Sequence, residues 1–189
     1  MAFIKTSTQY YKNSRYFLYS KVDRKDKAMV NKIVRLGRQQ KIVGDEMIKL
    51  WINNPVIHTY VIEHELRGYT AVASAAIFAM NVDGYLELLF LATCDTCKNA
   101  KLGMFLIGNT LRDYEKEGVN KIIIQACEES EGFYTSCGIG YSEVEHRYNL
   151  RWGGCIYMEG EINVILEYIA KKLSIDYLMP DIIYVGEKK

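Results

Sequence analysis

The stretch Tyr85–Gly103, which reads YLELLFLATCDTCKNAKLG, decides the fold of this chain. Its first half is apolar except for Glu87 and predicts a strand, and Cys94–Ala100 forms a polar loop after it. The loop runs directly into a helix, so the unpaired N–H groups of the first helical turn converge at a positive helix end. Such an end binds phosphate, and Gly103 would let a ligand approach the backbone closely.

The helix from Lys101 onward is amphipathic, and a second strand follows it. Gly118 lies where a C-terminal cap belongs, and Lys121–Cys127 (KIIIQAC) predicts a short buried strand. A strand, a helix and a strand in this order most simply form a right-handed crossover between parallel strands. The apolar stripe of the helix consists of Met104, Ile107, Leu111 and Tyr114.

The segments on either side of the crossover predict a mixed α/β (α+β) fold, with a mostly antiparallel central sheet, one parallel β-α-β crossover and flanking helices. The expected strands before it are Arg15–Val22, Val56–Glu63, Tyr69–Met80 and Tyr85–Thr93, with a turn at Asn81–Gly84 and helices ending near Arg38 and spanning Asp45–Asn53. The expected elements after it are a helix Glu131–Cys137 closed by Gly138, a strand Gly140–Arg151, a helix beyond Gly160 and a strand Ile182–Val185.

The composition is that of a folded domain and excludes several classes of protein. The 189 residues carry 24 basic and 23 acidic side chains, a formal net charge of +1, which disfavours a nucleic-acid partner. The longest apolar run, Ala71–Met80, is about half of the ~20 residues that a membrane helix needs. The five cysteines do not follow a secreted disulfide framework, so we expect reduced thiols and a cytoplasmic protein.

The loop and the segments that follow it resemble those of a known protein family. The run LATCDTCKNAKLG, the strand KIIIQAC and the later segment GFYTSCGIGY resemble the GNAT superfamily of acyl-CoA N-acyltransferases. In that family the acyl-CoA loop reads Arg/Gln-x-x-Gly-x-Gly/Ala; Lys98, Lys101 and Gly103 occupy its three defining places here, with lysine at the first glycine. Phe133, Tyr134, Gly138 and Ile139 are similar to the family's Phe-Tyr-x-x-x-Gly-Phe segment.

The resemblance implies acetyl-CoA as co-substrate, bound along the end of the first strand and the loop. The residues that it implies for this binding are Leu91, Ala92, Thr93, Lys98, Asn99, Ala100, Lys101, Leu102, Gly103 and Met104. It also implies a GNAT-like domain over residues 1–160. We expect residues 161–189 to form a helix and strand extension packed on that domain.

Glu87 and Tyr134 are the candidate catalytic residues. ELLFLAT, from Glu87 to Thr93, is similar to the strand that carries the catalytic glutamate in histone-acetylating members of the superfamily. Alternation places Glu87 on one face with Leu89 and Leu91, where an apolar setting raises a carboxyl pKa towards that of a general base. A solvated or lysine-paired Glu87 is the alternative. The resemblance implies Tyr134 as the acid that protonates the leaving thiolate, and plain packing is its alternative.

The expected function is transfer of an acetyl group from acetyl-CoA to a primary amine, with a protein lysine favoured. A GNAT-like module that binds coenzyme A or a protein without turnover is the alternative. The Cys94-x-x-Cys97 pair lacks the second pair that a zinc ribbon needs, so no metal is expected. The scattered histidines His58, His64 and His146 make a Cys-His acyl-enzyme the weaker mechanism.

Overall fold

A computed structural model describes residues 8–12, 15–41, 43–66, 69–142 and 155–176. The first half holds β1 (Thr8–Lys12), β2 (Arg15–Lys21), α1 (Lys27–Gln40), α2 (Asp45–Asn53), β3 (Ile57–Leu66), β4 (Tyr69–Met80) and β5 (Leu86–Thr93). The second half holds a 3-10 helix η1 (Asp95–Ala100), α3 (Leu102–Lys116), β6 (Lys121–Ala126), α4 (Glu128–Ser136), β7 (Gly140–Tyr141), β8 (Ile156–Glu161) and α5 (Ile162–Asp176).

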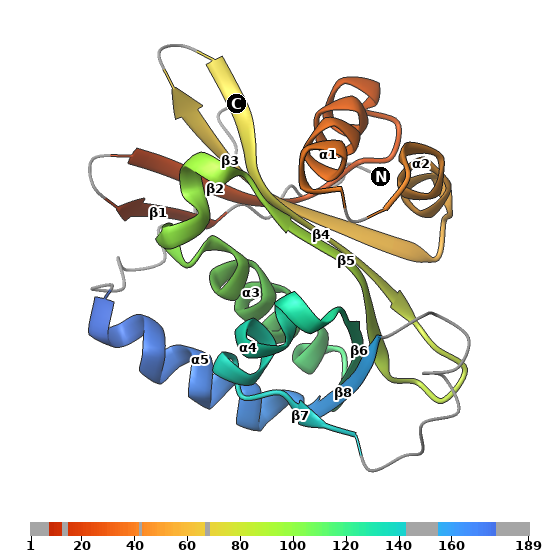
Figure 1. The fold of residues 1–189 in the computed structure, drawn as a ribbon, viewed down its shortest axis with the longest axis vertical. Coiled ribbons are helices and arrows are strands. Elements are labelled where there is room, and N and C mark those ends of the chain that lie inside the picture. The colour runs from red at the N-terminus through yellow and green to blue at the C-terminus, as the bar shows by residue number, and fades with distance from the viewer. Residues whose placement is uncertain (1–7, 13–14, 42, 67–68, 143–154, 177–189) are drawn as a thin grey trace.

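The described strands form one sheet in the order β1-β2-β3-β4-β5-β6-β8-β7 (Figure 1). β5 and β6 are parallel and are joined through α3, which confirms the predicted crossover. Every other recorded pairing is antiparallel. The fold is therefore the mixed, mostly antiparallel sheet expected from the sequence.

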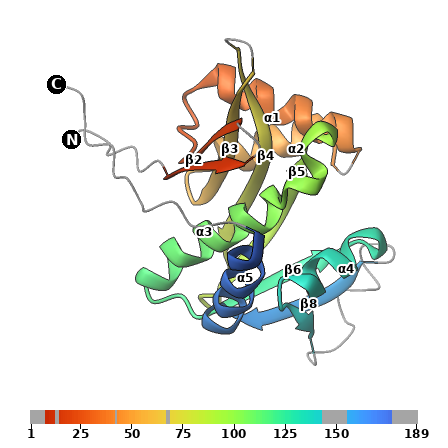
Figure 2. The same cartoon turned by 90° about the vertical axis from the view of Figure 1, so that its left-hand side faces the viewer.

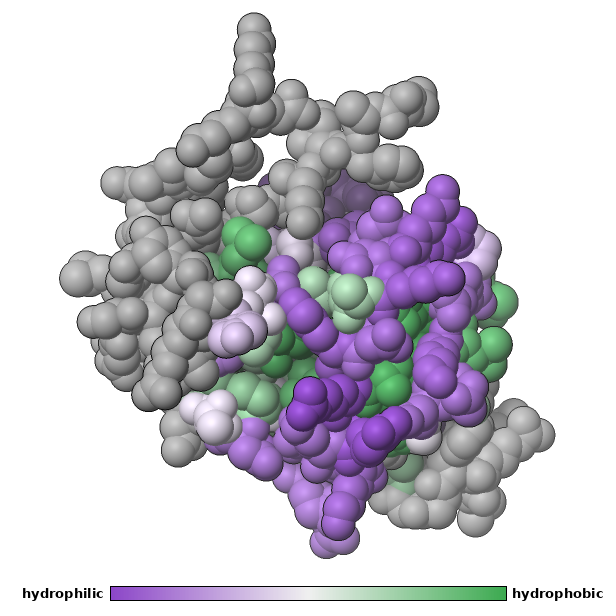
Figure 3. Space-filling model, turned by 90° about the horizontal axis from the view of Figure 1, so that it is seen from above, coloured by the Kyte–Doolittle hydropathy of each residue, from purple (hydrophilic) through white to green (hydrophobic). Residues whose placement is uncertain are grey.

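Helices cover both faces of the sheet, and each face has its own apolar core. On one face, α1 and α2 place Ile33, Ile48 and Ile52 against Ile77 and Phe90 of the sheet. On the other face, α3 packs on the sheet through Leu106, Ile107 and Leu111, together with residues of α4 and α5. Seen from above, most of the coloured surface is hydrophilic, with apolar side chains between (Figure 3).

The C-terminal helix α5 lies beside α3 (Figure 2). Its Ile165 and Ile169 are buried in the same core as α3. The contact is close because α3 carries a glycine there: a Cβ at Gly108 would lie 3.0 Å from Ile169 Cγ2. No described helix has both the length and the apolar composition needed to cross a membrane.

Several element boundaries match the sequence prediction and others differ. α2 and β4 have the predicted bounds, and both Gly118 and Gly138 adopt the positive φ expected after a helix. α4 begins at Glu128 instead of Glu131, because its first turn includes acidic residues that favour a helix N-terminus. β1 and β8 were not predicted. Gly140–Tyr141 is strand and Ser142 is not, whereas residues 143–151 of the predicted strand and the predicted strand Ile182–Val185 lie outside the described residues.

Candidate active site

The parallel strands β5 and β6 pair over only part of their length. The recorded partners run from Leu86 with Ile122 to Leu88 with Ile124. β5 then continues to Thr93 and β6 to Ala126, without recorded pairing between them in this part of the described chain. Backbone N–H and C=O groups on the facing edges therefore lack a strand partner beyond Leu88, and a ligand with amide groups could bond to them.

An irregularity in β5 lies at the start of this separation. β4 pairs Phe78 with Leu88 but Ile77 with Phe90, so Leu89 is an extra residue in β5, a β-bulge. The bulge reverses the alternation of side chains. Leu88 and Leu91 both pack on the α3 side, whereas Leu89 packs on the α1 and α2 side. The expectation that Glu87, Leu89 and Leu91 share one face is therefore wrong for Leu91.

The N-terminus of α3 lies directly after this strand end. Its first backbone hydrogen bond runs from Phe105 N to Lys101 O at 3.0 Å, and no described side chain caps the helix. The N–H groups of Leu102, Gly103 and Met104 precede that bond and point out of the helix end. Lys101 adopts a left-handed conformation, with φ 54 and ψ 22. Lysine thus has the backbone conformation that glycine adopts most easily.

The side chains of the two loop lysines contact other parts of the protein. Lys98 Nζ lies 2.6 Å from Asp95 Oδ1, and Asp95 also accepts a bond from Gln40 at 3.3 Å. Lys101 Nζ donates to the carbonyl of Lys172 in α5 at 3.4 Å. In this structure, the backbone of the loop is therefore better placed than its ammonium groups to meet an anion.

Gly103 marks a close approach between three elements. A Cβ at this position would lie 3.1 Å from Phe133 Cζ of α4 and 3.5 Å from Thr93 Oγ1 of β5. Thr93 Oγ1 is in turn 3.0 Å from Ser74 Oγ, which donates to the carbonyl of Ala92 at 2.9 Å. The end of β5 is thereby fixed to β4 next to the helix N-terminus.

Glu87 lies on β5 between Ala79 of β4 and Ile123 of β6. Its neighbours Leu86 and Leu88 point into the core under α3, so its side chain points to the opposite face of the sheet. Burial raises the pKa of the Glu87 carboxyl above its usual value. The ion pairs of the described residues do not include Glu87, so the structure does not support the lysine-paired alternative.

Tyr134 lies in α4 on the α3 side of the sheet, the face opposite to Glu87. Its ring is buried and packs edge-on against Phe133, with 5.2 Å between ring centroids. Burial raises the pKa of the Tyr134 hydroxyl, and Cys127 and Cys137 add to the rise. A group between the separating strands would thus have a carboxyl on one side and a phenol on the other.

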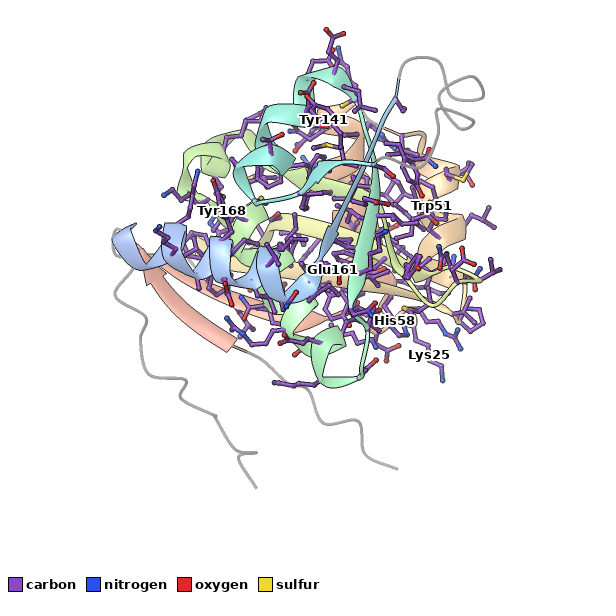
Figure 4. The ribbon with its side chains drawn as sticks, turned by 90° about the horizontal axis from the view of Figure 1, so that it is seen from below. Lys25, Trp51, His58, Tyr141, Glu161 and Tyr168 are labelled. Carbon is purple, nitrogen blue, oxygen red and sulfur yellow. The ribbon has the colours of Figure 1, made fainter. Side chains whose placement is uncertain are left out.

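Sequence reasoning did not include α5 in this region. Tyr168 of α5, labelled in Figure 4, has its Cβ 3.0 Å from where a Cβ of Gly138 would lie, just after α4. Lys172, one turn later, accepts the bond from Lys101. The apolar stripe after Gly160 indicated a packed helix, but not which end of α3 it would reach.

Comparison with known proteins gives a fold but no close sequence relative. No protein-family profile and no curated protein sequence matches the chain. Among solved structures, an aminoglycoside 6'-N-acetyltransferase complexed with coenzyme A is 14% identical, with a TM-score of 0.62 over 76% of this chain and 96% of that one.

Two further structures give the same result. The ribosomal-protein-S18-alanine N-acetyltransferase from Escherichia coli is 15% identical, with a TM-score of 0.61 over 77% of this chain and 94% of that one. An acetyltransferase of the GNAT family from Staphylococcus aureus is 9% identical, with a TM-score of 0.60 over 77% and 99%. Together with the parallel pair that separates beside the start of α3, these similarities show that the chain has the fold of the GNAT acetyltransferases.

Proposed function

We propose that this protein is an N-acetyltransferase that moves an acetyl group from acetyl-CoA to a primary amine by direct attack. The observation that carries the proposal is the separation of β5 from β6 after Leu88, next to the uncapped N-terminus of α3. One place in the chain thus combines strand edges with free bonding capacity and a helix end that favours an anion. Acetyl-CoA carries amide groups and a pyrophosphate, which these two features complement.

In the proposed complex, the pyrophosphate lies against the N–H groups of Lys98–Met104. The pantetheine arm lies between β5 and β6 and bonds to the strand edges around Leu91, Ala92 and Thr93. Asn99 and Ala100 are the last residues of η1, directly before this helix end, and in this proposal they contribute backbone groups. The close packing of Gly103 against Phe133 and Thr93 supports this placement, because it holds the helix end and the strand end together.

Glu87 acts as the general base in this proposal. An amine with a pKa of about 10.4 is mostly protonated at neutral pH and cannot attack a thioester until it loses a proton. A carboxylate whose pKa is raised by burial is a better proton acceptor than an exposed one. Glu87 takes the proton directly or through water, and the amine nitrogen then forms a bond to the thioester carbon.

The remaining steps use the backbone and Tyr134. The tetrahedral oxyanion accepts a hydrogen bond from a backbone N–H near Leu91–Thr93. When the carbon–sulfur bond breaks, Tyr134 donates its proton to the thiolate of coenzyme A. Because Glu87 and Tyr134 lie on opposite faces of the sheet, the base and the acid reach the reacting group from opposite sides.

The favoured acceptor is a protein lysine, since the segment from Glu87 to Thr93 resembles that of histone-acetylating enzymes. Two of the three similar structures are named for acetylating an aminoglycoside and the alanine of a ribosomal protein, so the common feature is an amine. Because the five cysteines do not follow a secreted framework, the proposed setting is the cytoplasm.

A second candidate function is binding of coenzyme A without turnover. It is favoured by the loop itself, where Lys98 is paired with Asp95 and Lys101 replaces the first glycine of the motif. The two functions separate in one experiment. Acetyl-CoA binding would be measured by calorimetry, and release of free thiol would be followed with lysine peptides, polyamines and aminoglycosides as acceptors. Binding with acceptor-dependent thiol release supports the transferase, and binding with no release from any amine supports the second function.

A further inference from the structure

A pocket of about 350 Å³ lies at the far end of α3 from the proposed acetyl-CoA site. α3 has 15 residues, so its two ends are roughly 22 Å apart at 1.5 Å per residue. The pocket is formed between β2, β3 and the last turn of α3. Its lining residues are Tyr19, Lys21, Tyr60, Asp113, Lys116 and Glu117.

One acidic group of this pocket is fixed in position by buried neighbours. The hydroxyl of Tyr19 donates to Asp113 Oδ2 at 3.0 Å and is 3.3 Å from Thr110 Oγ1. Tyr19 and Thr110 are both buried. Among the described residues, none donates a hydrogen bond to Asp113 Oδ1, so one carboxylate oxygen is held and the other is available.

The other charged groups of the pocket have no ion-pair partner among the described residues. Lys116 and Glu117 are exposed and form no salt bridge with another described residue. Lys21 Nζ lies 5.7 Å above the centre of the Tyr60 ring, and burial lowers the pKa of its ammonium. The pocket therefore brings together two cations and two anions that do not neutralise one another through direct contact.

The aromatic wall of the pocket is rigid. Tyr19 and Tyr60 stack with 5.8 Å between ring centroids, and Tyr60 packs edge-on against Tyr114. The hydroxyl of Tyr114 is 2.6 Å from His58 Nδ1 on β3. His58, labelled in Figure 4, thus ties the end of α3 to the sheet beside the pocket.

We infer that this pocket binds a small zwitterion, an α-amino acid with an apolar side chain. A ligand of one charge sign would meet two like charges on the pocket wall, whereas a zwitterion can pair its ammonium with Asp113 and Glu117 and its carboxylate with Lys21 and Lys116. The parts of Tyr19 and Tyr60 that line the pocket offer a small apolar surface to the side chain, since both residues are otherwise buried. The volume lies at the small end of the range of ligand pockets, about 300–1,000 Å³, which suits a molecule of this size.

The test is calorimetric titration of the full chain, without acetyl-CoA, with L-phenylalanine and two fragments of it. Phenethylamine lacks the carboxylate and 3-phenylpropanoate lacks the ammonium. We expect saturable binding of L-phenylalanine and at least roughly tenfold weaker binding of each fragment, the scale of one lost charged hydrogen bond. L-Leucine as a second probe should bind in the same way.

Variants of exposed residues in and beside the pocket test whether L-phenylalanine binds there. Glu117→Gln and Lys116→Gln change exposed side chains and should each weaken L-phenylalanine binding roughly tenfold, whereas Glu115→Gln on the same exposed end of α3 should leave it unchanged. Three results would overturn the inference: no saturable binding of either amino acid up to about 10 mM, a Kd near the weakest useful affinities; a fragment that binds as tightly as L-phenylalanine; or equal binding in all three variants. None of these results bears on acetyl transfer, because acetyl-CoA is absent.

Discussion

The two ends of α3 present two different kinds of surface. At its N-terminus the chain offers backbone groups, and the nearby charges of Lys98 and Lys101 are turned towards Asp95 and Lys172. At its C-terminus the chain offers side chains, with Lys21, Asp113 and Glu117 around a pocket between helix and sheet. The first end suits a ligand recognised by its phosphate and amide groups, and the second suits a ligand recognised by separated charges.

This difference also explains why the sequence predicted a candidate site at the N-terminal end of α3 but did not predict the pocket at its C-terminal end. The site that we propose at the N-terminus consists of consecutive residues at the end of β5, in η1 and at the start of α3, so a sequence motif can indicate it. The pocket joins Tyr19 of β2 to Asp113 of α3, which are 94 residues apart. A site assembled from such distant segments leaves no local pattern, because none of its parts is distinctive alone.

The largest effect is expected from Glu87→Gln. We expect kcat to fall roughly a hundredfold or more, with little change in the affinity for acetyl-CoA. This is the usual contribution of a positioned general base. The loss should shrink as pH rises, because more of the acceptor amine is then neutral without help. Steady-state rates across pH, with Asp83→Asn in the exposed β4–β5 turn as control, measure this. A variant with the native rate and pH profile would exclude Glu87 as the base.

A pH profile for the proposed activity of the native protein follows from the same group. Since burial raises the pKa of Glu87, the carboxyl stays protonated and unable to accept a proton to a higher pH than an exposed glutamate would. We expect kcat to rise as pH increases through that raised pKa. In Glu87→Gln this limb of the profile should be absent.

Gly103→Val is expected to have the next largest effect and to act only at the N-terminal end of α3. The new side chain would fill the approach between Phe133 and Thr93, so the Kd for acetyl-CoA should rise roughly tenfold to a hundredfold, the cost of overpacking a tight site. Calorimetry measures the Kd, and circular dichroism checks the fold. Gly44→Val is the matched control, because nothing lies within 4 Å of a Cβ there.

A second variant distinguishes two causes of weaker acetyl-CoA binding: a new valine side chain that blocks the ligand, and one that displaces the Phe133 ring. Phe133→Leu removes the nearest contact of the new side chain. If Gly103→Val with Phe133→Leu regains native acetyl-CoA affinity, the effect comes from the clash with Phe133, and the placement of the pyrophosphate at Gly103 is contradicted. Glu117→Gln at the other end should leave the Kd for acetyl-CoA unchanged.

A smaller effect is expected from Tyr134→Phe. The ring stays packed against Phe133 and only the hydroxyl is lost. We expect kcat to fall roughly tenfold. The effect is modest because a thiolate with a pKa of about 8.5 depends less on protonation by a general acid than an alkoxide leaving group would. Rapid-quench measurement of the chemical step should show the loss more strongly than steady-state turnover. Tyr141→Phe, at an exposed tyrosine, is the control, and equal effects of the two changes would remove Tyr134 from the mechanism.

The smallest effect is expected from Lys101→Gly. Holding a lysine in the left-handed conformation costs about 1–2 kcal/mol, and Lys101→Gly removes this cost. Glycine also makes the unfolded chain more flexible, which offsets part of the gain, so the free energy of unfolding should rise by about 0.5–1 kcal/mol. Lys41→Gly, at the only other described non-glycine residue with positive φ, should stabilise at least as much, because Lys101→Gly also removes the bond from Lys101 Nζ to the Lys172 carbonyl. Denaturant unfolding measures both. A Lys101→Gly variant that binds acetyl-CoA much more weakly than Lys41→Gly would show that the Lys101 side chain contacts the ligand.

The sequence predicted the crossover but not the details on which the chemistry depends. β4 was placed at its observed bounds because a long apolar run ends at the Asn81–Gly84 turn, and α2 because Asn-Asn-Pro follows it; both are strong local signals. β8 was missed because Gly160 within it resembles the break before a helix. The predicted sheet face of Leu91 was wrong because the β-bulge at Leu89 depends on how β4 pairs with β5. The sequence of β5 alone does not show that pairing.

The central claim is that acetyl-CoA binds at the N-terminal end of α3 and not at its C-terminal end. The most direct measurement is an NMR titration of ¹⁵N-labelled protein with acetyl-CoA, following the backbone amide signals of both ends. The account predicts large saturable shifts at Leu102, Gly103 and Met104, and none at Lys116 and Glu117. Absence of shifts at Leu102–Met104, or shifts confined to the pocket at Lys116 and Glu117, would contradict it.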